Sequence, residues 1–198
     1  MAEGFKQIVL TPSVLAAQEE YYGRRAGITP APERDPLTDE EREFIAARDS
    51  FYMATVTESG WPYVQHRGGK PGFLRILGPR TLAFADYKGN RQMLSTGNLA
   101  ANDRVALFLM DYPRRERLKI LGRASVKDAR PNPELLGQVV DEEHRPLVER
   151  VFVIEVVSFD WNCPQHITPR YTAEEVQELV APLQRRIAEL ESERSANS

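Results

Sequence analysis

Short apolar and β-branched runs, separated by turn residues, fill the middle of the chain and predict β-strands. The predicted strands cover residues 51–57, 63–67, 72–77, 81–85, 105–111, 117–127 and 150–161. Glu58-Ser59-Gly60 and Gly78-Pro79-Arg80 predict the turns of two hairpins. Six or seven short strands with tight turns favour a closed barrel.

Helical periodicity appears on both sides of this β-rich region and at two places within it. Thr38, with Glu41 three residues later, forms a capping box that predicts a helix from Asp39 to about Arg48. Shorter helices are predicted over residues 91–96 and 132–140. The chain therefore divides into an N-terminal helical extension and linker (1–37), a central β domain (38–168) and a C-terminal helix (169–198).

The C-terminal helix carries one apolar stripe with helical spacing. Its members are Val176, Leu179, Val180, Leu183, Ile187 and Leu190. Pro182 lies inside the stripe and predicts a kink, or a fresh start near Ala181, because proline removes a helix hydrogen bond. We expect the stripe to pack on the barrel or on a partner subunit rather than form a free coiled coil, since the run is short.

Composition narrows the classes of protein. The 198 residues are 41% hydrophobic and 28% charged, as in an ordinary globular protein, and the net charge of −3 argues against general nucleic-acid binding. No apolar run is long enough to span a bilayer, and the N-terminus lacks signal-peptide features, so we expect a cytoplasmic protein without membrane contact. The single cysteine, Cys163, excludes an internal disulfide. His66, His144 and His166 lack metal-ligand spacing, so no metal site is predicted.

Basic residues cluster in two segments of the β domain. The first holds Arg67, Lys70, Arg75, Arg80, Lys88 and Arg91 against one acid, Asp86, and the second holds Arg114, Arg115, Arg117, Lys119 and Arg123 against Glu116. In an acidic protein this bias points to an anionic ligand. Solvated strand edges protected by lysine and arginine explain it equally well.

The segment from Ala85 to Gln92 predicts a phosphate site. A strand ends in Lys88-Gly89-Asn90-Arg91, and a helix is expected to follow. Such a turn presents free backbone N–H groups, to which Lys88 and Arg91 add positive charge, and a phosphate dianion needs both. By itself the turn is a general anion nest.

Three other segments carry polar side chains in suggestive patterns. In Gln65-His66-Arg67-Gly68-Gly69-Lys70, strand alternation puts Gln65 and Arg67 on one face and His66 on the other. Arg117 and Lys119 share one strand face. Trp161 precedes a loop with Gln165 and His166. The alternatives are an edge strand with a Gly-Gly turn, a half-exposed strand, and a surface loop beside a core tryptophan.

The order of these segments resembles the pyridoxamine 5′-phosphate oxidase-like family of FMN-binding split-barrel proteins over residues 38–166. Gly89-Asn90-Arg91-Gln92 matches the family's phosphate turn Gly-x-Arg-Lys, with glutamine in place of the lysine. Asn102-Asp103-Arg104-Val105 matches Asn-Pro-Arg-Val. Arg117, ahead of Gly122-Arg123-Ala124, occupies the place of a residue that reaches the flavin of the other subunit.

The resemblance implies a mainly β fold with flanking helices, a six-stranded split β-barrel, and a homodimer with FMN at the subunit interface. The implied cofactor contacts are Gln65, His66, Arg67, Gly68, Lys70, Ala85, Asp86, Lys88, Gly89, Asn90, Arg91, Gln92, Arg117, Lys119, Trp161, Gln165 and His166. Hydride would pass through the flavin, and His166 is a weak candidate for a proton donor by its position.

The sequence departs from the family at the substrate motif. The family's Arg-x-His is absent, and the nearest segment, Pro169-Arg170-Tyr171, has no histidine two residues after the arginine. We therefore expect an FMN-dependent oxidoreductase with a different small-molecule substrate, for which NAD(P)H is a candidate electron donor. The alternatives are a flavin-binding sensor without catalysis, or the same barrel holding a deazaflavin or haem.

Overall fold

The computed structural model describes residues 2–31, 34–161 and 164–196, so Cys163 lies outside the described residues. Contacts divide the chain into unit 1, Met1–Met110 with Arg117–Cys163, and unit 2, Asp111–Glu116 with Pro164–Ser198. The N-terminal extension belongs with the barrel in unit 1, where the backbone N–H of Ala2 donates to the Asp160 carboxylate at 3.0 Å.

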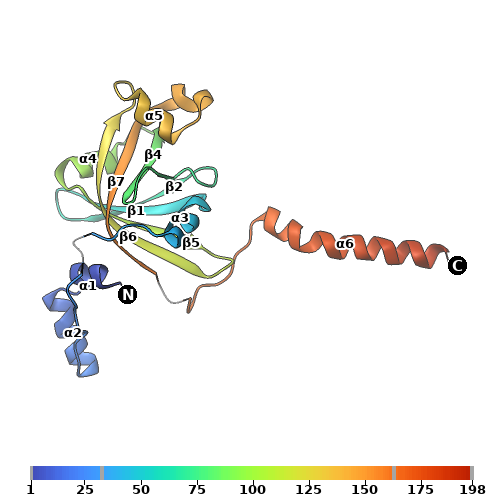
Figure 1. The fold of residues 1–198 in the computed structure, drawn as a ribbon, viewed down its shortest axis with the longest axis horizontal. Coiled ribbons are helices and arrows are strands. Elements are labelled where there is room, and N and C mark those ends of the chain that lie inside the picture. Colours follow the sequence, from blue (N-terminus) through green and yellow to red (C-terminus); the bar gives the residue numbers. More distant parts are fainter. Residues whose placement is uncertain (1, 32–33, 162–163, 197–198) are drawn as a thin grey trace. The chain divides into compact units, whose positions relative to one another are not determined.

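Seven strands form one sheet in the order β2-β1-β5-β6-β7-β4-β3 (Figure 1). Their bounds are β1 Ser50–Val56, β2 Pro62–Gly68, β3 Arg75–Ile76, β4 Thr81–Tyr87, β5 Arg104–Asp111, β6 Glu116–Asp128 and β7 Val148–Trp161. The mainly β prediction is confirmed. The strand beyond the expected six is β3, which pairs with β4 through only two residues.

The helices lie before, between and after the strands. Their bounds are α1 Glu3–Val9, α2 Pro12–Tyr22, α3 Asp39–Ala46, α4 Leu94–Ala101, α5 Pro133–Val139, the 3₁₀ helix η1 Glu142–Leu147, and α6 Ala173–Ala196. The helix predicted at residue 91 begins instead at Leu94, because Arg91 and Met93 both adopt positive φ angles. Within the described residues, no helix combines the length and the apolar character needed to cross a membrane.

The sheet curls until strands near its opposite ends meet. β2 is the first strand in the order and β4 is the sixth, yet Arg67 of β2 contacts Asp86 of β4. Inside the curl, the ring centroids of Phe51 and Phe84 lie 5.4 Å apart. The Phe84 ring stacks on Phe152, with 4.9 Å between their centroids. These rings are buried, so packing holds the curled sheet closed around one apolar core.

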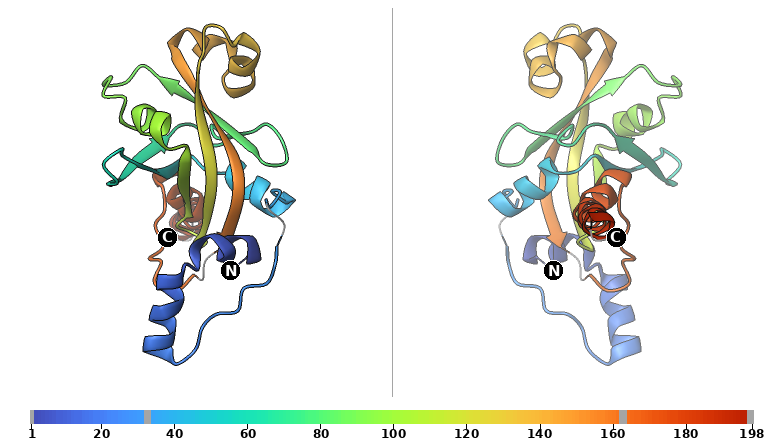
Figure 2. Two further views of the ribbon diagram at one scale, coloured as in Figure 1. Left: turned by 90° about the vertical axis from the view of Figure 1, so that its left-hand side faces the viewer. Right: turned by 90° about the vertical axis from the view of Figure 1, so that its right-hand side faces the viewer.

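The two longest strands, β6 and β7, pair along their length (Figure 2). Their register shifts between Leu121 and Gly122. A Cβ atom at Gly122 would lie 2.8 Å from both the Glu155 carbonyl oxygen and Ile154 Cγ2. Only glycine permits this close approach, and the bulge increases the bend that the curl requires.

Glu41 anchors α3 to the end of β7. Its buried carboxylate accepts hydrogen bonds from the backbone N–H of Thr38 at 3.0 Å, from the Thr38 hydroxyl, and from Trp161 Nε1 at 2.6 Å. The Trp161 ring packs edge-on against Phe44 at 4.8 Å. The predicted capping box is therefore confirmed, and it also serves as a tertiary contact.

We predict that Glu41→Ala lowers the free energy of unfolding by about 2–3 kcal/mol, because the helix loses its cap and the partly buried indole N–H of Trp161 loses its acceptor. Chemical denaturation monitored by tryptophan fluorescence measures this loss. Glu40→Ala is the matched control at an exposed position of the same helix, and it should change stability by less than about 0.5 kcal/mol. Equal effects of the two substitutions would contradict the anchor.

Candidate functional site

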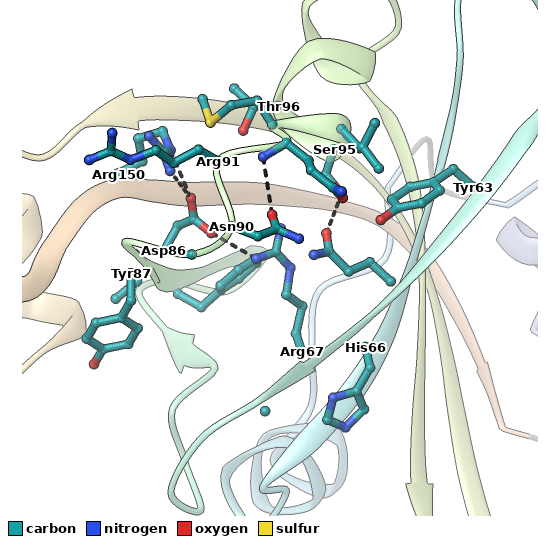
Figure 3. Close-up of a pocket in the computed structure, with 18 of the residues that line it drawn as sticks. Tyr63, His66, Arg67, Asp86, Tyr87, Asn90, Arg91, Ser95, Thr96 and Arg150 are labelled. Atoms are coloured by element: carbon teal, nitrogen blue, oxygen red, sulfur yellow. Dashed lines mark hydrogen bonds and ion pairs between the residues drawn. The ribbon is translucent and has the colours of Figure 1, made fainter.

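A pocket of about 410 Å³ opens between β2, β4 and the segment that leads into α4 (Figure 3). Its lining combines strand residues with a continuous loop. The residues are Tyr63, Gln65, His66, Arg67, Gly68, Phe73, Phe84, Ala85, Asp86, Tyr87, Gly89, Asn90, Arg91, Gln92, Met93, Leu94, Ser95, Thr96 and Arg150. The volume is in the range of sites for cofactors and other small molecules.

Asp86 joins two arginines at the wall of this pocket. One carboxylate oxygen accepts from Arg67 Nη1 at 2.8 Å, and the other accepts from Arg150 Nε and Nη2, each at 2.8 Å. Asp86 and Arg150 face each other in the β4–β7 register, so the backbone pairing itself places this ion pair. The side chains of all three residues are less than one-fifth exposed.

The Arg67 guanidinium is held by more than charge. It lies over the rings of Phe84 and Phe152, with its Cζ atom 5.4 and 4.9 Å from their centroids. Its Nε atom is buried and has no hydrogen-bond partner within the part of the chain that the structure describes. A buried donor without a partner is costly, so a ligand acceptor at this point would relieve a penalty already present in the fold.

The loop before α4 has an irregular backbone. Arg91 and Met93 adopt φ angles of 62° and 58°, in the left-handed region that non-glycine residues avoid. The Asn90 side chain accepts from the Gln92 backbone N–H at 3.2 Å. Turns that mix these conformations direct successive N–H groups inward, as anion-binding nests do. No ion pair of Arg91 occurs in the described residues, so its charge is available to a ligand.

Side-chain hydrogen bonds attach α4 to the neighbouring strands. The Ser95 hydroxyl donates to Gln65 Oε1 at 2.8 Å, and Asn98 Nδ2 donates to Thr55 Oγ1 at 2.9 Å. The first bond fixes the Gln65 amide and leaves its nitrogen as a donor at the pocket wall. The second holds the helix, and with it the preceding loop, against β1.

Ten of the predicted cofactor contacts line the pocket. They are Gln65, His66, Arg67, Gly68, Ala85, Asp86, Gly89, Asn90, Arg91 and Gln92. The predicted alternation of β2 is observed, because Gln65 and Arg67 are half-buried whereas His66 is exposed. The His66 ring lies apart from the arginine cluster (Figure 3) and packs edge-on against Tyr52 at 5.6 Å.

Five predicted contacts lie elsewhere in unit 1. Lys70 lines an adjoining pocket of about 160 Å³, and Lys88 is an exposed residue outside the lining of either pocket. Arg117 lies over Phe108, and Lys119 pairs with Asp160 at 3.0 Å. Trp161 packs against α3. Arg117, Lys119 and Trp161 do not line this chain's pocket, so their predicted roles depend on a partner subunit.

Gln165 and His166 belong to unit 2, and their assignment to the flavin site stays a prediction. Sequence reasoning missed Arg150, Tyr63 and Ser95 as pocket residues. Arg150 follows Glu149 near the start of a long, mainly apolar strand, and only the strand register reveals its pairing with Asp86. Among the described residues there is no group of three or more histidine, cysteine or acidic side chains that could hold a metal ion.

The antiparallel sheet is curled, and an arginine-lined pocket lies between its strands β2 and β4. These two features define the class of protein as a split barrel suited to an anionic ligand. The family model of pyridoxamine 5′-phosphate oxidase matches residues 37–160, and the chain belongs to this family. No curated protein matches the sequence.

Solved structures with a similar fold include a protein from Lactobacillus delbrueckii named for pyridoxamine 5′-phosphate oxidase. It has 22% identity and a TM-score of 0.50, over 63% of this chain and 93% of that one. General stress protein 26 of Bacillus anthracis has 12% identity and a TM-score of 0.47, over 61% and 88%. An FMN-binding protein from Syntrophomonas wolfei has 11% identity and a TM-score of 0.45, over 63% and 89%. The likeness to the Lactobacillus protein supports the same fold for this chain.

We predict that Asp86→Ala lowers the free energy of unfolding by about 2–4 kcal/mol, because two mostly buried guanidinium groups lose their shared counter-ion. Inorganic phosphate should restore part of this loss, measured as a larger rise in melting temperature than phosphate gives the unaltered protein. Asp103→Ala, which breaks an exposed ion pair with Arg123, should cost less than about 1 kcal/mol. Equal phosphate effects in all three proteins would refute a role of the cluster in anion binding.

Proposed function

We propose that the chain binds FMN in this pocket and is an FMN-dependent oxidoreductase acting on a small molecule. The observation that carries the proposal is the arrangement of Arg67, Arg91 and Arg150 around one pocket whose loop also offers backbone N–H donors. Membership of the pyridoxamine 5′-phosphate oxidase family supports a flavin as the ligand.

The phosphate would take the cationic end of the pocket. Arg91 supplies charge that is not neutralised within the described residues, and Arg67 supplies a buried Nε donor without a partner. Arg150 is bound to Asp86 and also to Glu149 at 3.0 Å, so it positions Asp86 and Arg67 rather than offering a free charge. A charged acceptor that meets several charge-assisted donors binds more tightly than one held by charge alone.

The flavin ring would bind at the opposite end of the pocket. Gln65 and Tyr63 line the pocket from β2, and the bond from Ser95 orients the Gln65 amide toward a polar ring edge. FMN, when bound, supplies hydride transfer at its N5 atom. The chain's residues orient the cofactor and separate its phosphate from solvent. The absence of the Arg-x-His motif favours a substrate other than pyridoxamine 5′-phosphate.

We include a homodimer in the proposal, with FMN at the interface and Arg117, Lys119 and Trp161 contributed by the partner subunit. Support comes from a further cavity, separate from the two pockets described above. It has a volume of about 410 Å³ and an almost wholly apolar lining that includes Phe5, Val64 and Phe108. Val64 is 59% exposed, which is unusual for valine in a strand and typical of a contact surface. NAD(P)H remains the candidate electron donor, and the cytoplasmic location stays a prediction.

We predict that the purified protein carries a chromophore with an absorbance maximum at about 450 nm, released on denaturation with the mass of FMN. A Soret band, a deazaflavin mass, or failure of the protein to bind added FMN would refute the cofactor assignment. Anaerobic mixing with NAD(P)H then tests catalysis, because a bound flavin that no donor reduces favours a sensor.

We predict that Arg91→Ala raises the Kd for FMN about ten- to a hundredfold, since one charge-assisted contact to phosphate is lost. Titration of the apoprotein by flavin fluorescence measures this change. Arg104→Ala removes an exposed arginine outside the pocket lining, and it should leave the Kd within about twofold. Riboflavin, which lacks the phosphate, should bind both variants alike, and a selective loss of riboflavin binding in Arg91→Ala would contradict the assignment.

A further inference from the structure

Helix α6 is a long, well-delimited helix within unit 2 (Figure 1). It spans 24 residues and begins with a reciprocal cap, in which Thr172 N–H donates to Glu175 at 2.8 Å and Glu175 N–H donates to the Thr172 hydroxyl at 3.2 Å. Arg170 lies just before the helix, and its Cζ atom is 4.9 Å from the centroid of the Tyr112 ring of the same unit. The remainder of unit 2 does not cover the apolar stripe, because Leu179, Leu183 and Ile187 are each more than half exposed.

The spacing of the stripe follows a heptad more closely than the broad face of a helix that packs on a sheet. Steps of four and three residues alternate along five of its six members, Val176, Val180, Leu183, Ile187 and Leu190. The sixth, Leu179, falls at a flanking g position, and Arg194 takes the next a position after Leu190. With Val176, Leu183 and Leu190 at the d positions, the a positions hold Val180 and Ile187. β-Branched residues at a with leucine at d favour two parallel strands.

The polar residues of α6 agree with this assignment. Pro182 occupies a c position, and Glu178, whose carbonyl loses its partner because proline has no N–H, occupies an f position. Both positions face away from an a/d seam. The defect introduced by proline therefore lies on the solvent side of a helix pair and leaves the seam intact.

The flanking charges distinguish parallel from antiparallel pairing. In a parallel pair, a g residue faces the e residue that lies five positions later on the other helix. Arg186 of each copy would therefore face Glu191 of the other copy, which gives two equivalent pairs. In the antiparallel register that pairs every a residue with a d residue, Arg186 would face Arg186 of the other copy. Charge complementarity thus favours the parallel arrangement.

We infer that α6 binds α6 of a second copy of this chain as a short parallel coiled coil, contrary to the expectation from the length of the run alone. The occupant of the stripe is thus the same helix of the partner, related by a twofold axis along the pair. The inference goes beyond the proposed function and does not depend on the flavin site.

Cysteine cross-linking of the full chain tests the inference. In a Cys163→Ser background, Val176→Cys and Leu190→Cys are each oxidised and separated on non-reducing gels. A parallel pair brings each cysteine beside its own copy, so both variants should form disulfide dimers several-fold more than Arg185→Cys, the control at an outward f position. In the antiparallel register, copies of residue 190 would lie about 15 Å apart, too far for a disulfide.

Charge variants give a second readout on the Leu190→Cys background. Arg186→Glu or Glu191→Arg alone should reduce dimer formation several-fold, and the double exchange should restore it. Cross-linking of neither cysteine variant above the Arg185→Cys control, as expected if the stripe packs on a barrel, would overturn the inference. So would equal cross-linking in all charge variants. FMN content measured on the same samples separates this outcome from failure of the flavin assignment.

Discussion

The Asp86 carboxylate, shared between Arg67 and Arg150, is the interaction on which the barrel and its pocket both depend. Three strands contribute one residue each: β2, β4 and β7. Since β2 and β4 lie near opposite ends of the sheet order, this bond can form only if the sheet curls. Removing charged groups from water is costly, and geometry this close, with aromatic rings against one guanidinium, offsets that cost. The same three residues that join β2, β4 and β7 therefore also contribute charge to the adjoining pocket.

The Arg67–Asp86–Arg150 cluster leaves one buried hydrogen-bond donor that a ligand could satisfy. Asp86 and Glu149 provide the counter-ions of Arg67 and Arg150, but Arg67 Nε keeps no partner in the described part of the chain. Arg91 reaches the same pocket from a loop whose backbone enters the left-handed region at two non-glycine residues. Such strain persists only where surrounding contacts fix it, and here the bonds from Ser95 and Asn98 hold α4 in place. Fold and loop together gather positive charge and N–H donors around one preformed pocket.

Local patterns in the sequence were sufficient for six of the seven strands, the α3 capping box and the sharing of one face by Gln65 and Arg67, whereas the strand predicted over residues 72–77 is reduced to Arg75–Ile76. Long-range register was not accessible in this way. Periodicity gives the face of a strand but not its partner residue, so Arg150 could not be matched with Asp86 before the β4–β7 pairing was known. The start of α4 was misplaced for a different reason, since no propensity predicts left-handed backbone at Arg91 and Met93. Lys88 has suitable charge and position in the sequence, yet it does not line the pocket.

The two surfaces proposed to self-associate constrain each other. A closed dimer requires that the apolar cavity beside Val64 and the α6 seam be related by the same twofold axis. If the two axes differed, each chain would join different partners through its two surfaces and the assembly would grow without closing. A parallel helix pair has its axis along the seam, so the segment between β7 and α6 must deliver both helices to that axis. Eleven residues separate β7 from α6, and among them Arg170 contacts the Tyr112 ring and Thr172 caps α6.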